Sequence, residues 1–495
     1  MLKIFLLCYF MTFIHFSSSE TLIFASLHSR HGARAPLDCD KNDKDFLGEH
    51  WTNPGELTPT GQRMEYILGL RNRQRYIVKN KFLSEQFDPH EILVYSTNVN
   101  RTIQSISSQL QGLYPLYNRS GYSLTKEQIK ESIPPVNTKL DEIQNGIKNL
   151  NNSSLPNYMT IIPIHTLSSS ERKMNVQDSF GCKEIVNKTR DNNKFNKQII
   201  KDATKKFNEK YSKQLNLYYD KNPENFKYDF DWIGLFCDTM VSDYSDGRTM
   251  EDFFNRTSIN KEELLEECKN IIIINFRDDF YGDDKNEVIL LAESKLINEV
   301  LYYMKLKIDE DIKNEMHTLN VSDYSSPKML IYSGHDSTLT GEELFMIKYF
   351  GPEVGLTVEN NYIYPTYTTQ LTFEVTRDNR KENMNYSSYN VTFYVNDNIL
   401  VTTTFDKFQK VIEKNTWNQE KVIEYCEGKK NNQNKNSVQL YIIIGLSLVA
   451  FIFLIIIIIS IFKIKIISKE EKKEKSESDE NNKNKGLFNE NKDEE

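Results

Sequence analysis

The sequence predicts an α/β core, a mostly helical cap and one C-terminal transmembrane helix. Short apolar runs at Leu22–Leu27, Glu91–Ser96 ("EILVYS") and Met329–Ser333 ("MLIYS") are typical of buried strands, and polar residues follow each one directly. Residues 186–308 are rich in Lys, Glu, Asn and aromatic residues and contain few strand-like runs, which favours a helical cap. Residues 438–462 contain no charged side chain and predict the membrane helix.

Residues 1–19 are expected to be a signal peptide. Lys3 is followed by the apolar run Ile4–Phe16 and then by Ser17–Ser19, which gives a basic start, an apolar core and small residues at a cleavage point. The apolar run is too short to cross a bilayer comfortably. A buried N-terminal helix is the alternative.

The apolar segment 438–462 would extend about 37 Å as a helix, enough to cross a hydrocarbon core of about 30 Å. Lysines lie on both sides of it, so the signal peptide decides the orientation and leaves the N-terminal bulk outside the cytosol. From Lys469 to Glu495 the chain is mostly Lys, Glu, Asn and Asp with few apolar side chains, and we expect residues 463–495 to form a disordered cytosolic tail. The chain is therefore expected to be a single-pass type I membrane protein.

Between these segments, residues 20–185 and 309–436 are expected to form the α/β core, and residues 186–308 the mostly helical cap. The polar, Asn-rich stretch 118–160 is interpreted as a surface insertion of the core.

Within the core, residues 57–75 predict a helix that begins after a Thr-Pro pair. "LTFEVT" from Leu371 and "VTFYV" from Val391 predict an antiparallel hairpin that closes the sheet. The run "IIII" at 271–274 is the strand-like exception in the cap.

Composition limits the function classes. The net charge of −8 and the lack of a basic stripe with interleaved aromatics argue against a nucleic-acid partner. No C-x-x-C pair or His/Cys cluster indicates a metal site, and no cofactor is expected. Sequons fit a glycosylated ectodomain and begin at Asn100, Asn118, Asn151, Asn152, Asn187, Asn255, Asn320, Asn385 and Asn390. The cysteines that remain after signal removal are Cys39, Cys182, Cys237, Cys268 and Cys426.

The stretch "LIFASLHSRHGARAP" places His31 between Arg30 and Arg34, just after the first predicted strand. Phosphoryl transfer needs positive charge on the phosphoryl oxygens, and arginine supplies it through paired hydrogen bonds. Arg101, after the second predicted strand, adds a third guanidinium. Positive neighbours lower the pKa of a histidine, so His31 would stay neutral in acid and could serve as the nucleophile.

The third predicted strand leads into the pair His335-Asp336. Asp336 can give a proton to a leaving alkoxide, and His335 can donate a further hydrogen bond to the phosphoryl oxygens. Because ligands of open α/β sheets bind at the carboxyl ends of strands, the three strand ends are expected to converge on one pocket. His28 and His165 are not assigned to the chemistry, and His165 is expected to be a packed strand residue.

These motifs resemble the histidine acid phosphatases, a branch of the phosphoglycerate-mutase-like superfamily. "SRHGARAP" resembles the R-H-G-x-R-x-P signature, and the similarity continues through "GELTPTGQRMEYILG", "VYSTNVNRTIQS", "QGLYP", "IPIHT", "LFCD" and "YSGHDSTL". Order and spacing are similar to the lysosomal and prostatic type from Leu22 to about Cys426. The resemblance implies a phosphoglycerate-mutase-like sandwich with a helical cap and no metal requirement. It implies phosphorylation of His31, phosphate binding by Arg30, Arg34, Arg101 and His335, and proton donation by Asp336.

The chain departs from the family pattern at two places. Asn98 and Asn100 replace the two aspartates usual before the arginine. Gln370 stands where vertebrate relatives have the cysteine that pairs with the equivalent of Cys237, so that bridge cannot form.

Two disulfides are considered for the remaining cysteines. Cys182 with Cys426 matches a family bridge. Cys237 is left to pair with Cys268, an option that would leave Cys39 as a free thiol.

The sequence thus predicts a membrane-anchored acid phosphatase that acts on phosphate monoesters, with its catalytic domain in a lysosome or phagosome or at the cell surface. A phosphoglycerate-mutase-like activity is disfavoured by the signal peptide and anchor. A phytase-like phosphatase remains an alternative, as does a catalytically inactive surface glycoprotein that uses the same fold for binding. The physiological ester and the oligomeric state are left open, with a homodimer as one arrangement.

Overall fold

The computed structural model describes residues 20–37, 53–115, 123–136, 138–166, 194–219, 221, 226–280, 287–315, 326–381, 384–418, 420–422 and 424–425. The chain divides into two compact units, Met1–Ile423 and Glu424–Glu495, and every element below belongs to the first. The predicted signal peptide, membrane helix and tail lie outside the described residues, as do Cys39, Cys182 and Cys426. Within the described ranges, no helix combines the length and apolarity needed to cross a bilayer.

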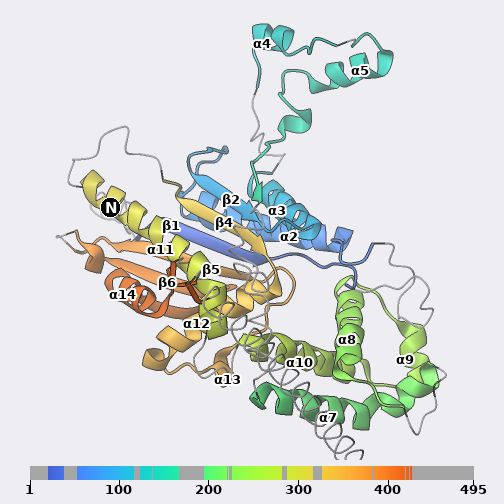
Figure 1. Ribbon diagram of the computed structural model, residues 1–495. Helices are drawn as coiled ribbons and strands as arrows, with labels where there is room; N and C mark the ends of the chain where they lie inside the picture. The colour runs from blue at the N-terminus through green and yellow to red at the C-terminus, as the bar shows by residue number, and fades with distance from the viewer. Residues whose placement is uncertain are drawn as a thin grey trace, which may run out of the picture. The chain divides into compact units, whose positions relative to one another are not determined.

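The described core is built on one mixed sheet with the strand order β3-β2-β4-β1-β5-β6-β7 (Figure 1). Strands β3, β2, β4 and β1 pair in parallel, and β5, β6 and β7 continue the sheet antiparallel to their neighbours. The strands are β1 (Glu20–Arg30), β2 (Ile92–Ser96), β3 (His165–Thr166), β4 (Met329–Gly334), β5 (Gln370–Asp378), β6 (Tyr389–Val395) and β7 (Asn398–Thr404). The three predicted strands and the hairpin are confirmed, and β7 extends the hairpin beyond the prediction.

Helices cover both faces of this sheet. The main ones are α2 (Pro59–Arg73), α3 (Asn100–Leu113), α11 (Glu287–Glu315), α12 (Asp336–Val354) and α14 (Phe405–Asn415). Because side chains alternate along a strand, β1 presents Ala25 and Leu27 to an apolar cluster that includes Ile106 of α3. On its other face, the His28 Nδ1 lies 2.7 Å from a carboxylate oxygen of Glu342 on α12. This arrangement is the predicted α/β sandwich.

Close contact between α2 and α3 depends on two glycines. A Cβ at Gly69 would overlap the backbone carbonyl of Gln109, and a Cβ at Gly112 would overlap that of Tyr66. The predicted helix at 57–75 is confirmed as α2, which begins at Pro59 with the Thr58 hydroxyl accepting a hydrogen bond from the Gly61 backbone N–H. The two helices hold the turn after β1 from one side.

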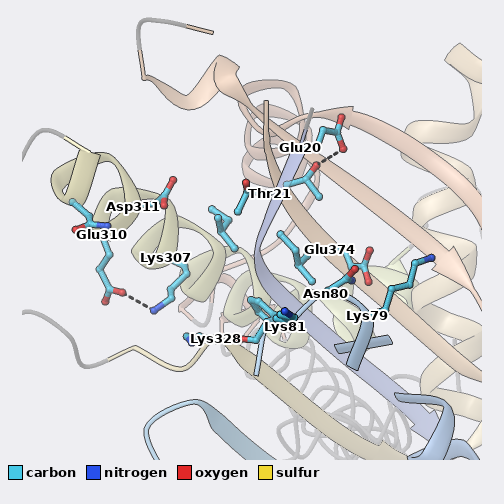
Figure 2. Close-up of a pocket in the computed structure, with 15 residues that line it drawn as sticks. Glu20, Thr21, Lys79, Asn80, Lys81, Lys307, Glu310, Asp311, Lys328 and Glu374 are labelled. Atoms are coloured by element: carbon cyan, nitrogen blue, oxygen red, sulfur yellow. Dashed lines mark hydrogen bonds and ion pairs between the residues drawn. The ribbon is translucent and has the colours of Figure 1, made fainter. Parts of the chain in front are cut away.

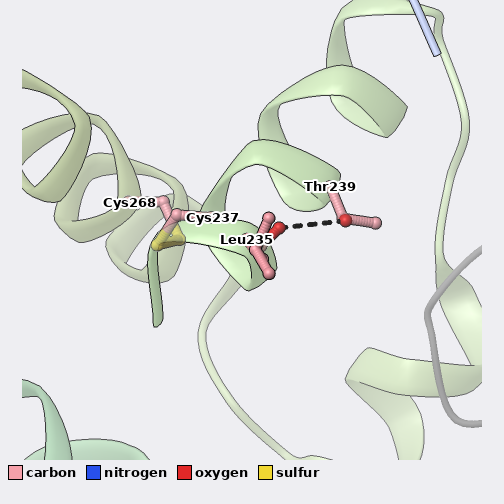
Figure 3. The surroundings of a disulfide bond; sticks show 4 residues. All are labelled: Leu235, Cys237, Thr239 and Cys268. Atoms are coloured by element: carbon pink, nitrogen blue, oxygen red, sulfur yellow. Dashed lines mark hydrogen bonds between the residues drawn. A yellow bond between two sulfur atoms is a disulfide. The ribbon is translucent and has the colours of Figure 1, made fainter. Parts of the chain in front are cut away.

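The helices of the predicted cap are α7 (Lys194–Tyr218), α8 (Phe230–Ser245), α9 (Glu251–Thr257) and α10 (Lys261–Phe280). They share an apolar core of their own, which includes Phe207, Phe236 and Leu264. A disulfide between Cys237 of α8 and Cys268 of α10 joins two of them, with a Cα–Cα distance of 4.8 Å (Figure 3). The pairing of these two cysteines, left as an option by the sequence, is therefore present.

The isoleucine run at 271–274 lies inside helix α10 and forms no strand. Leu264, Cys268, Ile271 and Ile272 are all buried, and their spacing follows the helical period. Helix α11 starts within the predicted cap range but packs against β1, α12 and α14, on the sheet.

The remaining described helices are short. They are α4 (Lys126–Glu131), α5 (Asp141–Leu150), α13 (Val358–Asn361), two 3-10 helices (Pro156–Tyr158 and Tyr386–Ser388) and a π-helix (Gln74–Lys79). Neither α4 nor α5, both within the predicted insertion 118–160, has a buried residue.

Candidate active site

His31 lies directly after β1, where the strand ends in a tight turn against α2. A Cβ on Gly32 would overlap the backbone of Gly61, so a glycine is needed where the turn meets the helix. The His31 Nδ1 lies 2.9 Å from the carbonyl oxygen of Gly32. A carbonyl can only accept, so Nδ1 carries the proton and, in the neutral ring, Nε2 keeps a free electron pair.

Three arginines surround this histidine, and each is held by a different element. Arg30 Nη2 lies 2.7 Å from Asp336 Oδ2, and its Nη1 donates to the Pro365 carbonyl at 2.7 Å. Its guanidinium carbon also lies 4.3 Å from the ring centroid of Tyr367. These contacts fix the guanidinium of Arg30 beside the turn that carries His31.

Arg34 is held by the cap. Its Nη1 and Nη2 donate to Oδ2 and Oδ1 of Asp238 on α8, at 3.1 and 2.7 Å, and Asp238 Oδ2 also accepts from the Leu37 backbone N–H at 2.9 Å. A bidentate salt bridge of this kind fixes the plane of the guanidinium as well as its position. The cap therefore positions a residue of the candidate site.

Arg101, in the first turn of α3, contacts His335, which directly follows β4. Arg101 Nη2 lies 3.3 Å from His335 Nδ1, and His335 Nε2 lies 3.0 Å from the Thr97 hydroxyl. Arginine has no acceptor, so Nδ1 accepts and the proton is on Nε2, which donates to Thr97. The rings of His31 and His335 are 5.6 Å apart between centroids.

Asp336 is the first residue of α12 and is buried. Its Oδ1 accepts from the Ser337 backbone N–H at 2.9 Å, and its Oδ2 accepts from the Tyr364 hydroxyl at 3.1 Å and from Arg30. The structure thus brings together all six residues that the sequence singled out for the chemistry. They are Arg30, His31, Arg34, Arg101, His335 and Asp336.

Burial and positive charge set the protonation states of the two histidines. Burial, followed by the nearby arginines, holds the pKa of His31 well below its ordinary value of 6.5. The same causes lower the pKa of His335 to about 3. Both rings are therefore neutral at mildly acidic pH, in agreement with the tautomers inferred from their hydrogen bonds.

The same burial acts on the charged partners. Burial, followed by the charge of Arg34, lowers the pKa of Arg101 to about 10, and the guanidinium stays charged in acid. Burial alone would raise the pKa of Asp336, but Arg30 and Arg34 outweigh it and hold that pKa below its ordinary value of 3.8. Asp336 is therefore ionised in the unliganded site.

Three buried donors at this site have no partner among the described residues: the Nε atoms of Arg30, Arg34 and Arg101. An unsatisfied buried N–H costs about 1–3 kcal/mol, more when it is charged. Three such donors around one neutral histidine are suited to receive an oxyanion.

Sequence reasoning missed four residues that hold this cluster: Thr97, Asp238, Tyr364 and Tyr367. Asp238 lies within the quoted "LFCD" motif, and Thr97 within "VYSTNVNRTIQS", so a search of each motif for polar neighbours could have found them. His28, which was left unassigned, is a buried partner of Glu342. His165 lies in β3, but it is exposed, and the prediction that it is packed was wrong because β3 is the edge strand.

A separate cavity of about 720 Å³ opens near the start of β1, at the other end of the strand from His31 (Figure 2). Lys79, Lys81 and Lys307 line it together with Glu310 and Glu374. Both cationic and anionic side chains line it, and Lys307 is paired with Glu310 at 2.8 Å. It contains none of the site residues predicted from the sequence.

Comparison with known proteins gives a consistent assignment. A family model described as the histidine phosphatase superfamily (branch 2) matches residues 21–396. The prostatic acid phosphatase of Bos taurus is 25% identical over 338 residues, which cover 67% of this chain and 71% of that protein. The lysosomal acid phosphatase of Xenopus laevis is 37% identical over 99 residues, covering 20% of this chain and 22% of that protein.

Solved structures share the fold at low sequence identity. The apo phytase of Hafnia alvei matches with a TM-score of 0.51 and 12% identity, over 81% of this chain and 98% of that one. A multiple inositol polyphosphate phosphatase of Bifidobacterium longum, in complex with inositol hexasulfate, matches with a TM-score of 0.50 and 11% identity, over 81% of this chain and 94% of that one. At these identities the likeness shows the fold alone.

The mixed sheet and the cationic cluster at its strand ends are those of an anion-handling α/β enzyme. The family match spans most of the chain, and the chain belongs to the histidine phosphatase superfamily, branch 2. The resemblance drawn from the sequence is confirmed, and the chain is a phosphatase.

Proposed function

We propose that this phosphatase is a membrane-anchored acid phosphatase that hydrolyses phosphate monoesters through a phosphohistidine on His31, with Asp336 as proton donor. The observation that carries the proposal is the neutral His31 ring, whose Nδ1 is committed to the Gly32 carbonyl. Its Nε2 electron pair is free in the middle of three charged guanidiniums, which is the arrangement an in-line attack on a phosphoryl group requires.

In the first step, the Nε2 of His31 forms a bond to phosphorus while the bond from phosphorus to the ester oxygen breaks. The leaving oxygen keeps that electron pair and takes a proton from Asp336. Arg30, Arg34 and Arg101 neutralise the phosphoryl oxygens, and their unpartnered Nε donors are available for hydrogen bonds. A phosphoryl oxygen replaces Thr97 as the acceptor of the His335 Nε2 proton.

Asp336 must gain a proton before it can donate one. In the unliganded site it is ionised because Arg30 lies 2.7 Å away. A bound phosphate adds negative charge beside the carboxyl and competes for Arg30, and both effects raise the proton affinity of Asp336. Low pH completes the protonation while His31 stays neutral, so we expect the rate to be highest in acid.

The experiment is a pulse of ³²P-labelled substrate followed by an acid-free quench. Wild-type protein is expected to carry the label on His31, in a linkage stable to alkali and labile to acid. His31→Ala is expected to lose turnover on every substrate, because the accepting atom is gone. His165→Ala, which changes an exposed histidine of β3, serves as the matched control. Label on a serine or an aspartate would refute the nucleophile assignment.

Two further alternatives are separated by substrate choice. The Hafnia alvei phytase shares the fold, so myo-inositol hexakisphosphate should be compared with simple monoesters by kcat/KM. A preference for the inositol ester would favour a phytase-like enzyme. Wild-type protein without turnover on any ester would favour a surface glycoprotein that only binds.

The membrane topology is proposed from residues 1–19 and 438–462. We propose a type I protein whose catalytic domain faces the lumen of a lysosome or phagosome, or the cell exterior. Protease treatment of sealed membranes is expected to remove only the tail 463–495. Loss of the catalytic domain from sealed vesicles would contradict the orientation.

A further inference from the structure

Tyr364 lies between α13 and β5 and contacts two residues of the candidate site at once. Its hydroxyl donates to Asp336 Oδ2 at 3.1 Å, and it accepts from Arg30 Nη1 at 3.3 Å. The guanidinium carbon of Arg30 is 5.5 Å from the centroid of its ring. None of the motifs quoted from the sequence includes this tyrosine, and the proposed reaction assigns it no role.

We propose that Tyr364 is the positioning residue of the proton-donor step: its hydroxyl orients the Asp336 carboxyl and stabilises the carboxylate as its proton passes to the leaving oxygen. This inference rests on the proposed function, in which Asp336 protonates that oxygen.

The direction of the hydrogen bond supports this role. Burial raises the pKa of the Tyr364 phenol well above 10, so the hydroxyl keeps its proton throughout the working range. Oδ2 can accept the hydrogen bond from Tyr364 whether Asp336 is ionised or protonated, because a protonated carboxyl oxygen still has a free electron pair. The bond is stronger to the carboxylate than to the acid, since charge-assisted hydrogen bonds are about twice as strong as neutral ones. Proton transfer to the leaving group is thereby favoured.

Arg30 cannot perform this task alone, because bound phosphate competes for the same guanidinium. The charged and titratable groups near Asp336 are Arg30 and Arg34 from β1 and the turn after it, Arg101 from α3, His335 from the start of α12, and Tyr364. When the arginines turn to the phosphate, Tyr364 and the Ser337 backbone N–H remain as the donors on the carboxyl.

The test uses Tyr364→Phe, which removes the hydroxyl and keeps the ring. Tyr362→Phe is the matched control, because it removes a neighbouring hydroxyl that lies 2.9 Å from the hydroxyl of Thr340. Both are compared with Asp336→Asn on glycerol phosphate, a poor leaving group, and on p-nitrophenyl phosphate, a good one. The measured quantity is kcat/KM, which reports phosphoryl transfer to the enzyme even where hydrolysis of the phosphoenzyme limits kcat.

We expect Tyr364→Phe to lose about ten-fold in kcat/KM on glycerol phosphate, the effect of one hydrogen bond to a charged group, and much less on p-nitrophenyl phosphate. The alkaline limb of its pH–rate profile should shift to higher pH, because Asp336 loses a donor that favours its ionised form. In the Asp336→Asn background, Tyr364→Phe should add no leaving-group-dependent loss. Tyr362→Phe should behave as wild type.

The outcomes separate this inference from the function it rests on. If Asp336→Asn shows the leaving-group dependence and Tyr364→Phe does not, the role of Tyr364 is overturned and the proposed function stands. If Asp336→Asn loses equally on both substrates, the proton-donor assignment falls, and the role of Tyr364 falls with it. Equal losses for Tyr364→Phe on both substrates, with an unshifted pH profile, would show a purely structural role.

Discussion

Replacing Glu343 by glutamine is expected to make the stability of this protein less dependent on pH. Glu343 lies on α12 and is buried, with Oε1 accepting from the Ile363 backbone N–H at 2.8 Å. Its Oε2 has no hydrogen-bond partner among the described residues. Burial raises the pKa of this carboxyl from 4.5 to about 8, so the folded protein holds it as the neutral acid.

The sign and size follow from the proton balance. Below pH 4.5 both the folded and the unfolded chain hold the proton, and the free energy of unfolding does not change with pH through this group. Between pH 4.5 and about 8 the unfolded chain releases it while the folded chain keeps it. The free energy of unfolding therefore falls by about 1.4 kcal/mol per pH unit for this group. The loss is complete above about pH 8, with an upper limit of about 5 kcal/mol.

The assay is urea unfolding of the chain in mild detergent at several pH values from 5 to 8, followed by tryptophan fluorescence. Glutamine keeps an acceptor for the Ile363 N–H and cannot ionise. The free energy of unfolding should therefore fall less steeply with pH, by up to about 1.4 kcal/mol per pH unit, which corresponds to one proton. Some slope should remain, because burial also raises the pKa of Glu65 and Glu293. The control Glu353→Gln alters an exposed carboxylate of the same helix, paired with Lys407. Identical slopes for Glu343→Gln and wild type would refute the reasoning.

Three further outcomes are expected. Thr97→Val removes the acceptor that the His335 Nε2 proton uses only in the unliganded site, so the Kd for inorganic phosphate should fall several-fold, whereas Thr97→Ser should bind phosphate as wild type does; an unchanged Kd in the valine variant would contradict the inferred tautomer. Asp238→Asn leaves the buried Arg34 charge without its ionic partner, so unliganded protein should be less stable by up to about 3 kcal/mol and inorganic phosphate should raise its Tm more than that of wild type. Activity should survive EDTA, because arginines supply the positive charge for the phosphoryl oxygens; strict dependence on added Mg²⁺ or Zn²⁺ would contradict the mechanism.

The parts of this protein that could be predicted are those specified locally. The strands at β1, β2 and β4 follow from short apolar runs, and helix α2 follows from its Thr-Pro start and helical spacing. Each strand leads directly into a polar motif, so a parallel sheet brings those motifs to one edge whatever the loops do. That is why the six residues proposed for the chemistry could be grouped from the sequence before the fold was known.

The parts that could not be predicted depend on distant contacts. Asp238 reaches Arg34 across 204 positions, and Tyr364 reaches Arg30 across 334. Asp238 lies within a quoted motif, but nothing local in the sequence indicates that Arg34 is its partner, and Tyr364 lies in no quoted motif. The isoleucine run at 271–274 was interpreted as strand-like for a related reason. Four adjacent isoleucines fit a buried strand as well as a helix packed into the cap core, and they lie in α10.

The two carboxylates on the arginines explain how the site exists without its substrate. Buried guanidiniums without an anion would be costly, and breaking such a pair costs about 3–5 kcal/mol. Asp336 pairs with Arg30 and Asp238 pairs with Arg34, so both guanidiniums are already oriented when phosphate arrives. In the mechanism that we propose, substrate binding exchanges one set of ion pairs for another, and its net affinity is the difference between them. The exchange also favours release, because the same carboxylates regain the arginines when inorganic phosphate leaves. In the proposed mechanism it couples binding to chemistry as well, since the phosphate that draws Arg30 away would allow Asp336 to take up the proton that we propose it donates.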